Sequence, residues 1–531
     1  MEAVTALLVL LLLLLLAGLW ALGPSRPANF PPGPRPWSWL GTLPELLLMA
    51  RLGQTAAFDR LARRYGPVFG LMLPGGRPLV VVRDFALMKQ AFGEPAFTGR
   101  PDIFAFIYRA FMKKQGLVFA EGDLWTEHRR FALSHLRQLG FGKRSMERHM
   151  ADEYRGLSHQ LRAAAGRPLP LRGLFDASII NVIWQVIAGR RYALGDGRLA
   201  ELQATIAELV SVAGVTVPMN VCPPVRHLLP RWSGFQLADN HRRKVADMFA
   251  ELVREHAETW RAGQPPRDYV DEFLTAAAEP GAAERGYTEQ NLAVIGMDLF
   301  SAGSDTTSHV LGWTLLELSV RPSWQRRLQR QLDGAVGRRR LPQLADLPRL
   351  PLLRAVIEEV LRRHTVLPHA LPHCTSFGAA PLGRYTVPRG AFVYSDLRAV
   401  HMDETHWEEP AAFRPDRFLD GQGQFRADER HVAFGVGRRR CPAETVARQE
   451  LLLFTGGLLH QFTVRPGAEA PPADADGPRK EGFVHMPPSV SVVLEWREDA
   501  DLTDQEQPTD SAGGRHLQIT SPAAADGKTR C

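Results

Sequence analysis

An apolar segment at the start of the chain places the strongest constraint on the rest of it. Residues Ala3–Leu22 are almost all apolar, with a leucine run at Leu10–Leu16, and only Met1 and Glu2 precede them. About 20 apolar residues cross a bilayer core as one helix. A cleavable signal peptide would have a basic start and a shorter apolar stretch, so the pattern favours a retained transmembrane signal-anchor at residues 1–23. No second stretch of this kind follows, which excludes a multi-span transporter.

A proline-rich segment follows the anchor. Residues 24–37 contain Pro31-Pro32-Gly33-Pro34-Arg35-Pro36. Proline fixes φ and removes backbone donors, so the segment is predicted to be a stiff, extended hinge, either a plain linker or a device that sets the body against the membrane. Arg26 and Arg35 follow the apolar segment, and the positive-inside rule then puts the body on the cytosolic side.

The body, residues 38–497, is predicted to be mainly α-helical with a small β portion. Helical apolar spacing is found at 248–260, 291–318, 324–336 and 352–363. Short β-rich runs are found at 68–73, 79–82, 391–394 and 489–494, and Thr386-Val387 precedes a Pro-Arg-Gly turn. The polar residues 498–531 are predicted to form a disordered tail.

Charge and cysteine content limit the kinds of partner and site. Lysine and arginine exceed aspartate and glutamate by 64 − 57 = 7, a mild excess that fits an anionic membrane surface or an acidic partner and does not call for nucleic acid. The four cysteines form no Cys-x-x-Cys pair, so a disulfide framework or a zinc cluster is not expected. A single functional thiolate remains possible in this composition.

The densest chemical signal is the run from Phe434 to Glu444. Its glycines would let the backbone approach a bulky planar ligand, and Cys441 is predicted to open a helix. A thiolate at a helix N-terminus beside three arginines is electrostatically favoured and suits the axial position of a haem iron. On this local pattern alone, a buried structural cysteine after a glycine-rich turn explains the residues equally well.

The long helical segment at 291–318 carries a second unusual run, Ala302-Gly303-Ser304-Asp305-Thr306-Thr307. A helix interior seldom contains glycine, serine and two threonines together, so the run indicates either a local kink or a widened groove. An acid and an alcohol side by side suit proton delivery.

Together these runs resemble the cytochrome P-450 haem-thiolate monooxygenases. The haem loop of that family reads Phe-x-x-Gly-x-Arg-x-Cys-x-Gly, and the chain supplies Phe434, Gly437, Arg439 and Cys441, with Ala443 in place of the last glycine. The resemblance implies the cytochrome P-450 fold, haem b with its iron bound by Cys441, and the oxygen-handling pair Asp305 and Thr306. It covers roughly residues 31–497.

The resemblance also assigns roles to residues that would otherwise pass as ordinary surface or core positions. It implies that Trp125, Arg129, His373 and Arg439 hold the haem propionates. It further implies that Glu359 and Arg362, which share a helix face, join Arg417 in a buried structural triad.

The implied reaction is insertion of one oxygen atom from dioxygen into a hydrophobic, lipid-like substrate: a steroid or ecdysteroid, a sesquiterpenoid, a fatty acid or a xenobiotic. The chain has no flavin, nicotinamide or iron–sulfur fingerprint, so the electrons must come from another protein. The anchor and hinge resemble the endoplasmic-reticulum class served by an NADPH-dependent flavoprotein reductase, with cytochrome b5 as a second candidate donor. Basic residues expected on the docking face are Arg129, Arg130, Arg137, Lys143, Arg144, Arg438 and Arg440.

Aromatic and apolar residues are expected to form the substrate pocket. The candidates are Phe104, Phe106, Tyr108, Phe111, Val210–Pro218, Phe300 and Val366–Leu371. Two other functions remain open, namely a haem-thiolate isomerase acting on peroxides and a membrane-tethered haem-binding sensor. The intact Asp305-Thr306 pair favours the monooxygenase over both.

Overall fold

In the computed structural model of the chain, the described residues are 25–37, 40–197, 199, 201, 217–261, 263–469 and 483–497. The predicted anchor at residues 1–23 and the predicted tail at 498–531 lie outside them. Among the described residues, no helix is both long enough and apolar enough to cross a membrane.

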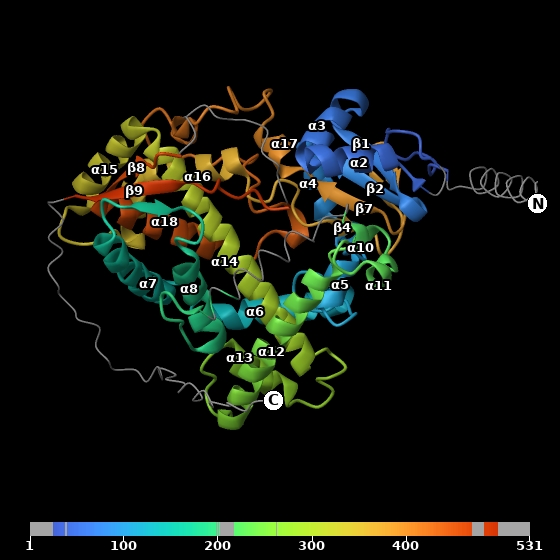
Figure 1. Cartoon of the computed structure of the whole chain (residues 1–531), viewed down its shortest axis with the longest axis horizontal. Coiled ribbons are helices and arrows are strands. Elements are labelled where there is room, and N and C mark those ends of the chain that lie inside the picture. The colour runs from blue at the N-terminus through green and yellow to red at the C-terminus, as the bar shows by residue number, and fades with distance from the viewer. Residues whose placement is uncertain are drawn as a thin grey trace, which may run out of the picture.

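Helices dominate the structure, as the sequence predicts, and α14 runs diagonally through its middle (Figure 1). The helices are α2 Leu43–Leu52, α3 Gln54–Tyr65, α4 Phe85–Gly93, α5 Phe104–Arg109, α6 Gly122–Gln138, α7 Arg144–Ala163, α8 Asp176–Ala188, α10 Pro218–Val221, α11 Val225–Leu228, α12 Phe235–Thr259, α13 Tyr269–Ala277, α14 Glu289–Ser319, α15 Pro322–Val336, α16 Pro351–His364, α17 Leu397–His401 and α18 Glu444–Gln461.

The strands in the described part of the chain form three small sheets. The four-stranded sheet has the order β1-β2-β7-β4, the second sheet has the order β3-β9-β8, and β5 pairs with β6. The strands are β1 Val68–Leu73, β2 Arg77–Val82, β3 Pro168–Pro170, β4 His373–Cys374, β5 Ala380–Leu382, β6 Tyr385–Val387, β7 Phe392–Ser395, β8 Phe462–Pro466 and β9 Ser491–Trp496.

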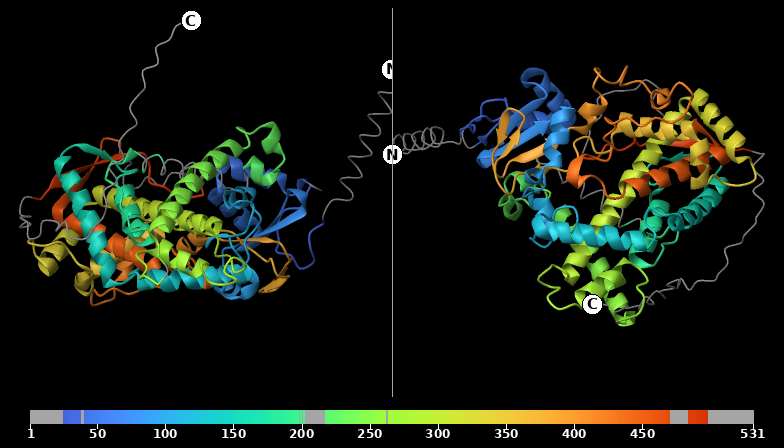
Figure 2. Two further views of the ribbon diagram at one scale, coloured as in Figure 1. Left: turned by 90° about the horizontal axis from the view of Figure 1, so that it is seen from below. Right: turned by 180° about the vertical axis from the view of Figure 1, so that it is seen from behind.

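The four-stranded sheet and α2, α3 and α4 lie at one end of the molecule, and the larger helices fill the other (Figure 2). Every residue of β1 is buried, which fits a continuous apolar run covered on both faces. The β2–β7 pair is parallel, with Leu79 opposite Phe392, whereas β1–β2 and β4–β7 are antiparallel. This arrangement brings segments that are far apart in the sequence into one sheet.

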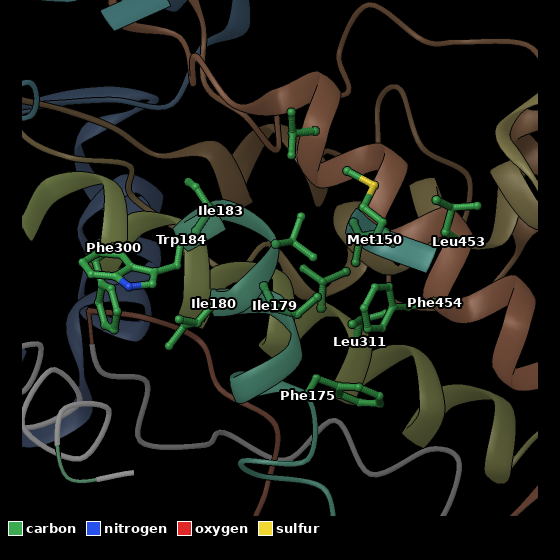
Figure 3. Packing of buried hydrophobic residues seen from close by; sticks show 14 of the residues in the cluster. Met150, Phe175, Ile179, Ile180, Ile183, Trp184, Phe300, Leu311, Leu453 and Phe454 are labelled. Carbon is green, nitrogen blue, oxygen red and sulfur yellow. The ribbon is translucent and has the colours of Figure 1, made fainter. Parts of the chain in front are cut away.

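Helix α14 is the centre of the helical part. It begins at a cap in which the Thr288 hydroxyl accepts a hydrogen bond from the Asn291 amide. Most of its side chains are buried, because helices pack against several of its faces. Helix α8 lies against it, and Trp184 of α8 meets Phe300 of α14 there (Figure 3).

Helix α12 is longer than the apolar spacing indicates. The sequence marks only 248–260 as helical, but the helix begins at Phe235. The buried stripe of its first half consists of Ala238, His241 and Val245. A small residue and a polar one occupy two of these three positions, so the hydrophobic period is weak there although the packing is helical.

The hinge segment is docked on the body over residues 25–37. The Gly70 amide donates to the Pro32 carbonyl at 2.8 Å, and the buried Phe30 packs above Gly70 of β1. A Cβ at Gly33 would lie 1.9 Å from the Gly70 carbonyl oxygen, so this close approach requires glycine. The described hinge is therefore held against the β1 strand.

Candidate functional site

The Cys441 loop enters the site between α4 and α18. The Cys441 amide donates to the Phe434 carbonyl at 2.9 Å, which closes the loop on itself. A short 3₁₀ turn, η6 at Gly437–Arg439, packs against the end of α4. A Cβ at Gly437 would lie 1.9 Å from the Phe92 carbonyl oxygen, so this glycine allows the loop to approach α4 closely. A Cβ at Gly435 would meet nothing within 4 Å and would face open space.

Cys441 does not open a helix, which corrects the sequence-based prediction. Helix α18 begins at Glu444, three residues later. Pro442 disfavours the helical conformation for Cys441, and Pro442 and Ala443 form a turn that precedes the helix. Ala443 has φ −95° and ψ 8°, values that any L-residue adopts, so the absence of the usual glycine causes no backbone strain.

The electrostatics of the thiol also differ from the prediction. Burial raises the pKa of Cys441, and the Ala443 amide, Arg129 and Arg440 offset this only in part. Arg438 points to solvent, and Arg440 pairs with Glu444 at 2.7 Å. The protein alone therefore favours the thiol, and a bound cation is needed to make the thiolate the stable form.

Trp125 and Arg439 stack on one another beside this loop. The Arg439 guanidinium lies 3.8 Å from the Trp125 ring centroid, and its Nε and one terminal nitrogen donate to the Thr98 and Ala120 carbonyls at 3.0 and 2.7 Å. The Trp125 Nε1 and the other terminal nitrogen of Arg439 are buried and have no hydrogen-bond partner within the described residues. Buried donors of this kind require an acceptor.

Arg129 lies in the next turn of α6. Its guanidinium lies 5.5 Å from the Trp125 ring centroid and donates to the Arg440 carbonyl at 2.7 Å. Burial lowers its pKa, and the nearby Cys441 raises it again in part. The two residues of α6 named from the sequence therefore lie together at the Cys441 loop.

Arg100 belongs to the same group, although the sequence did not single it out. It is 4% exposed, and its guanidinium donates to the carbonyls of Val118, Leu371 and Pro372. Burial and the charge of Arg129 lower its pKa to about 9, and burial together with Arg100 and Arg129 lowers the pKa of Arg439 to about 8. We call Arg100, Arg129 and Arg439 the cationic cluster.

The cationic cluster fits the two propionates of a haem. The side-chain hydrogen bonds of these arginines go to backbone carbonyls, so no carboxylate among the described residues forms an ion pair with them. The unpartnered donors of Trp125 and Arg439, the open space at Gly435 and the thiol of Cys441 suit a planar, dianionic, iron-bearing group. The residues present therefore fit haem b.

His373 lies on β4, where its ring is 4.3 Å from that of Phe92. Its Nδ1 lies 2.7 Å from the Phe97 carbonyl, which can only accept, so Nδ1 carries the proton. Burial, with Arg100 and Arg439, lowers its pKa well below the usual value, so the ring is neutral. Donation to a propionate would require a second proton on Nε2, and the role of His373 as a propionate donor stays a prediction.

We expect Trp125→Phe to weaken haem retention while preserving the stack on Arg439. Loss of one hydrogen bond to a charged group costs ~1.5–3 kcal/mol, which corresponds to roughly 10- to 100-fold faster haem release. Transfer of haem to an acceptor protein measures this rate. The control is Trp324→Phe on α15, where the tryptophan ring lies 4.2 Å from Arg327, far from this site. Equal release rates in the two variants would contradict the donor role of Trp125.

Asp305 and Thr306 lie in an unbroken stretch of α14. The helix is continuous from Glu289 to Ser319, so the kink considered for this run is absent. The Thr306 hydroxyl donates to the Ala302 carbonyl at 2.9 Å. Ala302 and Thr306 both expose part of their surface, although the rest of the helix is largely buried. Ser304 donates to Asp305 at 3.2 Å. Burial, with a contribution from Asp176, raises the pKa of Asp305 to about 7.

The structure brings Glu359, Arg362 and Arg417 together behind the loop. Arg362 donates two hydrogen bonds of 2.8 and 2.9 Å to the Glu359 carboxylate. The Nε of Arg417 lies 3.2 and 3.1 Å from the two oxygens of the same carboxylate. Arg362 also donates to the His401 and Pro410 carbonyls at 2.7 Å. The three charged groups thereby join α16 to the segment that leads to Cys441.

The expected pocket residues do not all line one space. Phe300 is 1% exposed and packs against Trp184 at 5.3 Å, so it belongs to the core and not to a pocket wall. Phe104 and Tyr108 on α5 stack at 5.5 Å and meet Phe235 of α12. Of Val210–Pro218, residues 210–216 lie outside the described part of the chain.

Comparisons with known proteins agree with this arrangement. The family described as Cytochrome P450 matches residues 31–494. Farnesoate epoxidase from Bombyx mori is 34% identical over 439 residues, which cover 82% of this chain and 88% of that protein. Cytochrome P450 2D6 from Homo sapiens is 36% identical over 443 residues, with 82% and 88% coverage. Cytochrome P450 2D10 from Mus musculus is 35% identical over 445 residues, with 82% and 86% coverage.

Proposed function

The chain belongs to the cytochrome P450 family, and from this premise we propose that it is a membrane-anchored monooxygenase for a hydrophobic, lipid-like substrate. One oxygen atom would enter the substrate and the other would leave as water, with two electrons from NADPH and two protons. The observation that carries the proposal is the cationic cluster beside the Cys441 loop, which requires an anionic partner.

In this proposal, different residues of the chain would bind the iron, bind the propionates and handle protons. Cys441 would bind the haem iron, and Trp125, Arg129, Arg439 and Arg100 would hold the propionates. The haem, when bound, supplies the activation of dioxygen. Asp305 would hold a proton near neutral pH, and the Thr306 hydroxyl, now bonded to Ala302, could turn to share one with the reacting oxygen.

The apolar environment of α5 supports a lipid-like substrate. Phe104, Tyr108 and Phe235 form an aromatic group where α5 meets α12. The name of one relative, farnesoate epoxidase, states an isoprenoid acid as what that protein oxidises. We therefore place sesquiterpenoids first among the candidate substrates, ahead of steroids, fatty acids and xenobiotics.

The outer face of α6 supports docking of an NADPH-dependent flavoprotein reductase. A hollow of about 560 Å³ lies along this helix, lined by Arg130 and Arg137 and also by Trp125 and Arg129, which we assign to the haem. Within the described part of the chain, Arg137, Lys143 and Arg438 are exposed and have no carboxylate partner, whereas Arg130 pairs with Glu127 at 2.8 Å. The side chain of Arg144 lies outside the described residues. Unpaired cations suit an acidic partner.

The membrane location follows from the sequence and forms part of the proposal. The apolar residues 1–23 would anchor the chain in the endoplasmic reticulum, and the body would face the cytosol. The docked hinge at residues 25–37 would then hold the β1 side of the body close to that membrane.

The full chain, expressed in membranes, tests the proposal in two steps. The carbon-monoxide difference spectrum of the reduced protein should show the strongly red-shifted band of thiolate-bound haem. With reductase and NADPH, a panel of sesquiterpenoids, steroids, fatty acids and xenobiotics should give a product one oxygen atom heavier. Conversion of a peroxide without reductase would indicate an isomerase instead. A haem spectrum with no turnover of either kind would indicate a haem sensor.

A further inference from the structure

Arg109 and Asp298 form an ion pair between the end of α5 and the middle of α14. Both side chains are almost fully buried, at 6% and 1% exposed. One Asp298 oxygen accepts a hydrogen bond from Arg109, and the other accepts from the Leu117 and Val118 amides at 2.7 and 2.8 Å. Backbone amides stabilise a carboxylate, so Asp298 keeps two donors even when Arg109 turns to another acceptor.

The Arg109 guanidinium has more donors than partners. A guanidinium carries five N–H donors, and within the described residues Arg109 donates one hydrogen bond, to Asp298. Its Nε is buried and has no partner there. Arg100, which is equally buried, donates instead to three backbone carbonyls. Because a buried donor without an acceptor is costly, Arg109 requires an acceptor from outside this part of the chain.

A second buried polar group, His241, lies on α12, which packs against α5. Ala238, one turn before it, belongs to the same apolar cluster as the start of α5, and the Tyr108 hydroxyl of α5 donates to Asp239 at 2.6 Å. His241 is fully buried, and neither ring nitrogen has a hydrogen-bond partner among the described residues. Burial and the charge of Arg109 lower its pKa to about 3, so the neutral ring offers one donor and one acceptor.

One aromatic ring separates Arg109 from the cationic cluster. The Phe119 ring centroid lies 5.9 Å from the guanidinium carbon of Arg109 and 5.9 Å from that of Arg100. Phe106 stacks on Phe119 with ring centroids 3.9 Å apart. Arg109 therefore lies close to the residues that we assign to the haem propionates, beside two apolar rings.

The position of Asp298 on α14 sets the distance from Arg109 to the expected reaction centre. Asp298, Ala302 and Asp305 follow one another at intervals of four and three residues, so they share one face of the helix. The seven residues from Asp298 to Asp305 span about 10 Å along the helix axis. A group bound at Arg109 would thus be separated from the reacting carbon by most of the length of a lipid chain.

We propose that Arg109, together with His241, binds the carboxylate of a lipid-like acid, and that the chain oxidises this acid at a carbon remote from the carboxyl group. The proposal rests on the proposed monooxygenase function and narrows its substrate class to lipid acids. The Arg109 Nε and one His241 N–H would donate to the carboxylate. A guanidinium binds a carboxylate more strongly than the carbonyl of an ester or the hydroxyl of an alcohol, because both partners are charged.

The test uses three probes that share one chain and differ in the head group: farnesoic acid, its methyl ester and farnesol. The full-length, haem-loaded protein should bind the acid about 10- to 100-fold more tightly than the other two, with Kd taken from the substrate-binding spectrum. With reductase and NADPH, the oxygen atom should enter the acid at the far end of its chain. Equal affinity for acid and ester, or oxidation beside the carboxyl group, would overturn the proposal, and neither measurement needs a variant.

Two variants should change the affinity for the acid in opposite directions. Arg109→Lys keeps a positive charge beside Asp298 but loses the planar set of donors, so it should weaken binding of the acid about 10-fold and leave the ester unaffected. Asp298→Asn removes a negative charge beside the site, so it should tighten binding of the acid about 10-fold. An ion pair with only a structural role would affect all three probes alike in both variants.

The matched control is Arg83→Lys. Arg83 forms an ion pair of 2.9 Å with Asp396 at the end of the four-stranded sheet, and both side chains are largely buried. This variant should keep the preference for the acid. If Arg109→Lys fails to load haem, Asp298→Asn decides, and an unchanged affinity of that variant for the acid would contradict the role of Arg109. Turnover of neutral lipids without preference for the acid would refute this inference alone, whereas absence of the thiolate band in the unaltered protein would contradict the proposed function.

Discussion

Cys441→Ser is expected to abolish the red-shifted carbon-monoxide band and to reduce oxygen insertion to background. A serine hydroxyl is far less acidic than a thiol and gives no thiolate to push electron density toward the bound oxygen. Since burial already raises the pKa of Cys441, the native protein depends on the iron to hold the deprotonated sulfur, and serine has no comparable affinity for it. The difference spectrum of reduced membranes measures the effect directly.

The matched control for this substitution is Cys222→Ser. Cys222 is an exposed free cysteine after α10, so its replacement should leave both the band and the activity unchanged. A red-shifted band that persists in Cys441→Ser would show that another residue binds the iron. The buried Cys374 on β4 would then be the first to examine.

The second large effect is expected for Glu359→Gln. Glu359 and Arg362 are both fully buried, and the same carboxylate also accepts a hydrogen bond from the Arg414 amide at 2.8 Å and contacts Arg417. Removal of its charge leaves buried guanidinium groups without compensation, which costs ~3–5 kcal/mol. The measurement is the yield of haem-loaded protein together with the denaturant midpoint of unfolding.

An exposed glutamate supplies the comparison. The Glu409 side chain is 70% exposed and meets Arg414 at 3.0 Å, so Glu409→Gln should change stability by about 1 kcal/mol or less. If Glu359→Gln were as stable as Glu409→Gln, the buried contacts around Arg362 would not be what fixes the segment before Cys441. A normal haem yield for both would lead to the same conclusion.

Elements with strong apolar patterns were predictable from the sequence. The strand at 68–73 matches β1, and the helices at 291–318, 324–336 and 352–363 match α14, α15 and α16 to within two residues at each end. The start of α18 was misplaced by three residues, because the apolar pattern after Cys441 does not reveal the turn at Pro442 and Ala443. The spacing of Glu359 and Arg362 predicted that they share one face of a helix, and their hydrogen bonds on α16 confirm this.

Residues whose partners lie far away in the chain could not be found in this way. Arg100 sits in a loop, and only the fold brings it beside Arg129 and Arg439. Phe300 was placed in a pocket wall because its apolar character cannot distinguish a wall from the core, and its contact with Trp184 decides the matter.

The cationic cluster has a consequence for the life of the protein in the cell. Without haem, the charges of Arg100 and Arg439 repel one another, and buried donors of Trp125 and Arg439 lack acceptors within the described residues, so the newly made chain carries an electrostatic penalty that its prosthetic group removes. Binding of a ligand to the folded state alone stabilises that state by mass action. Protein made while porphyrin is scarce should therefore be degraded quickly, and its abundance should follow the supply of haem even when its transcript level is constant.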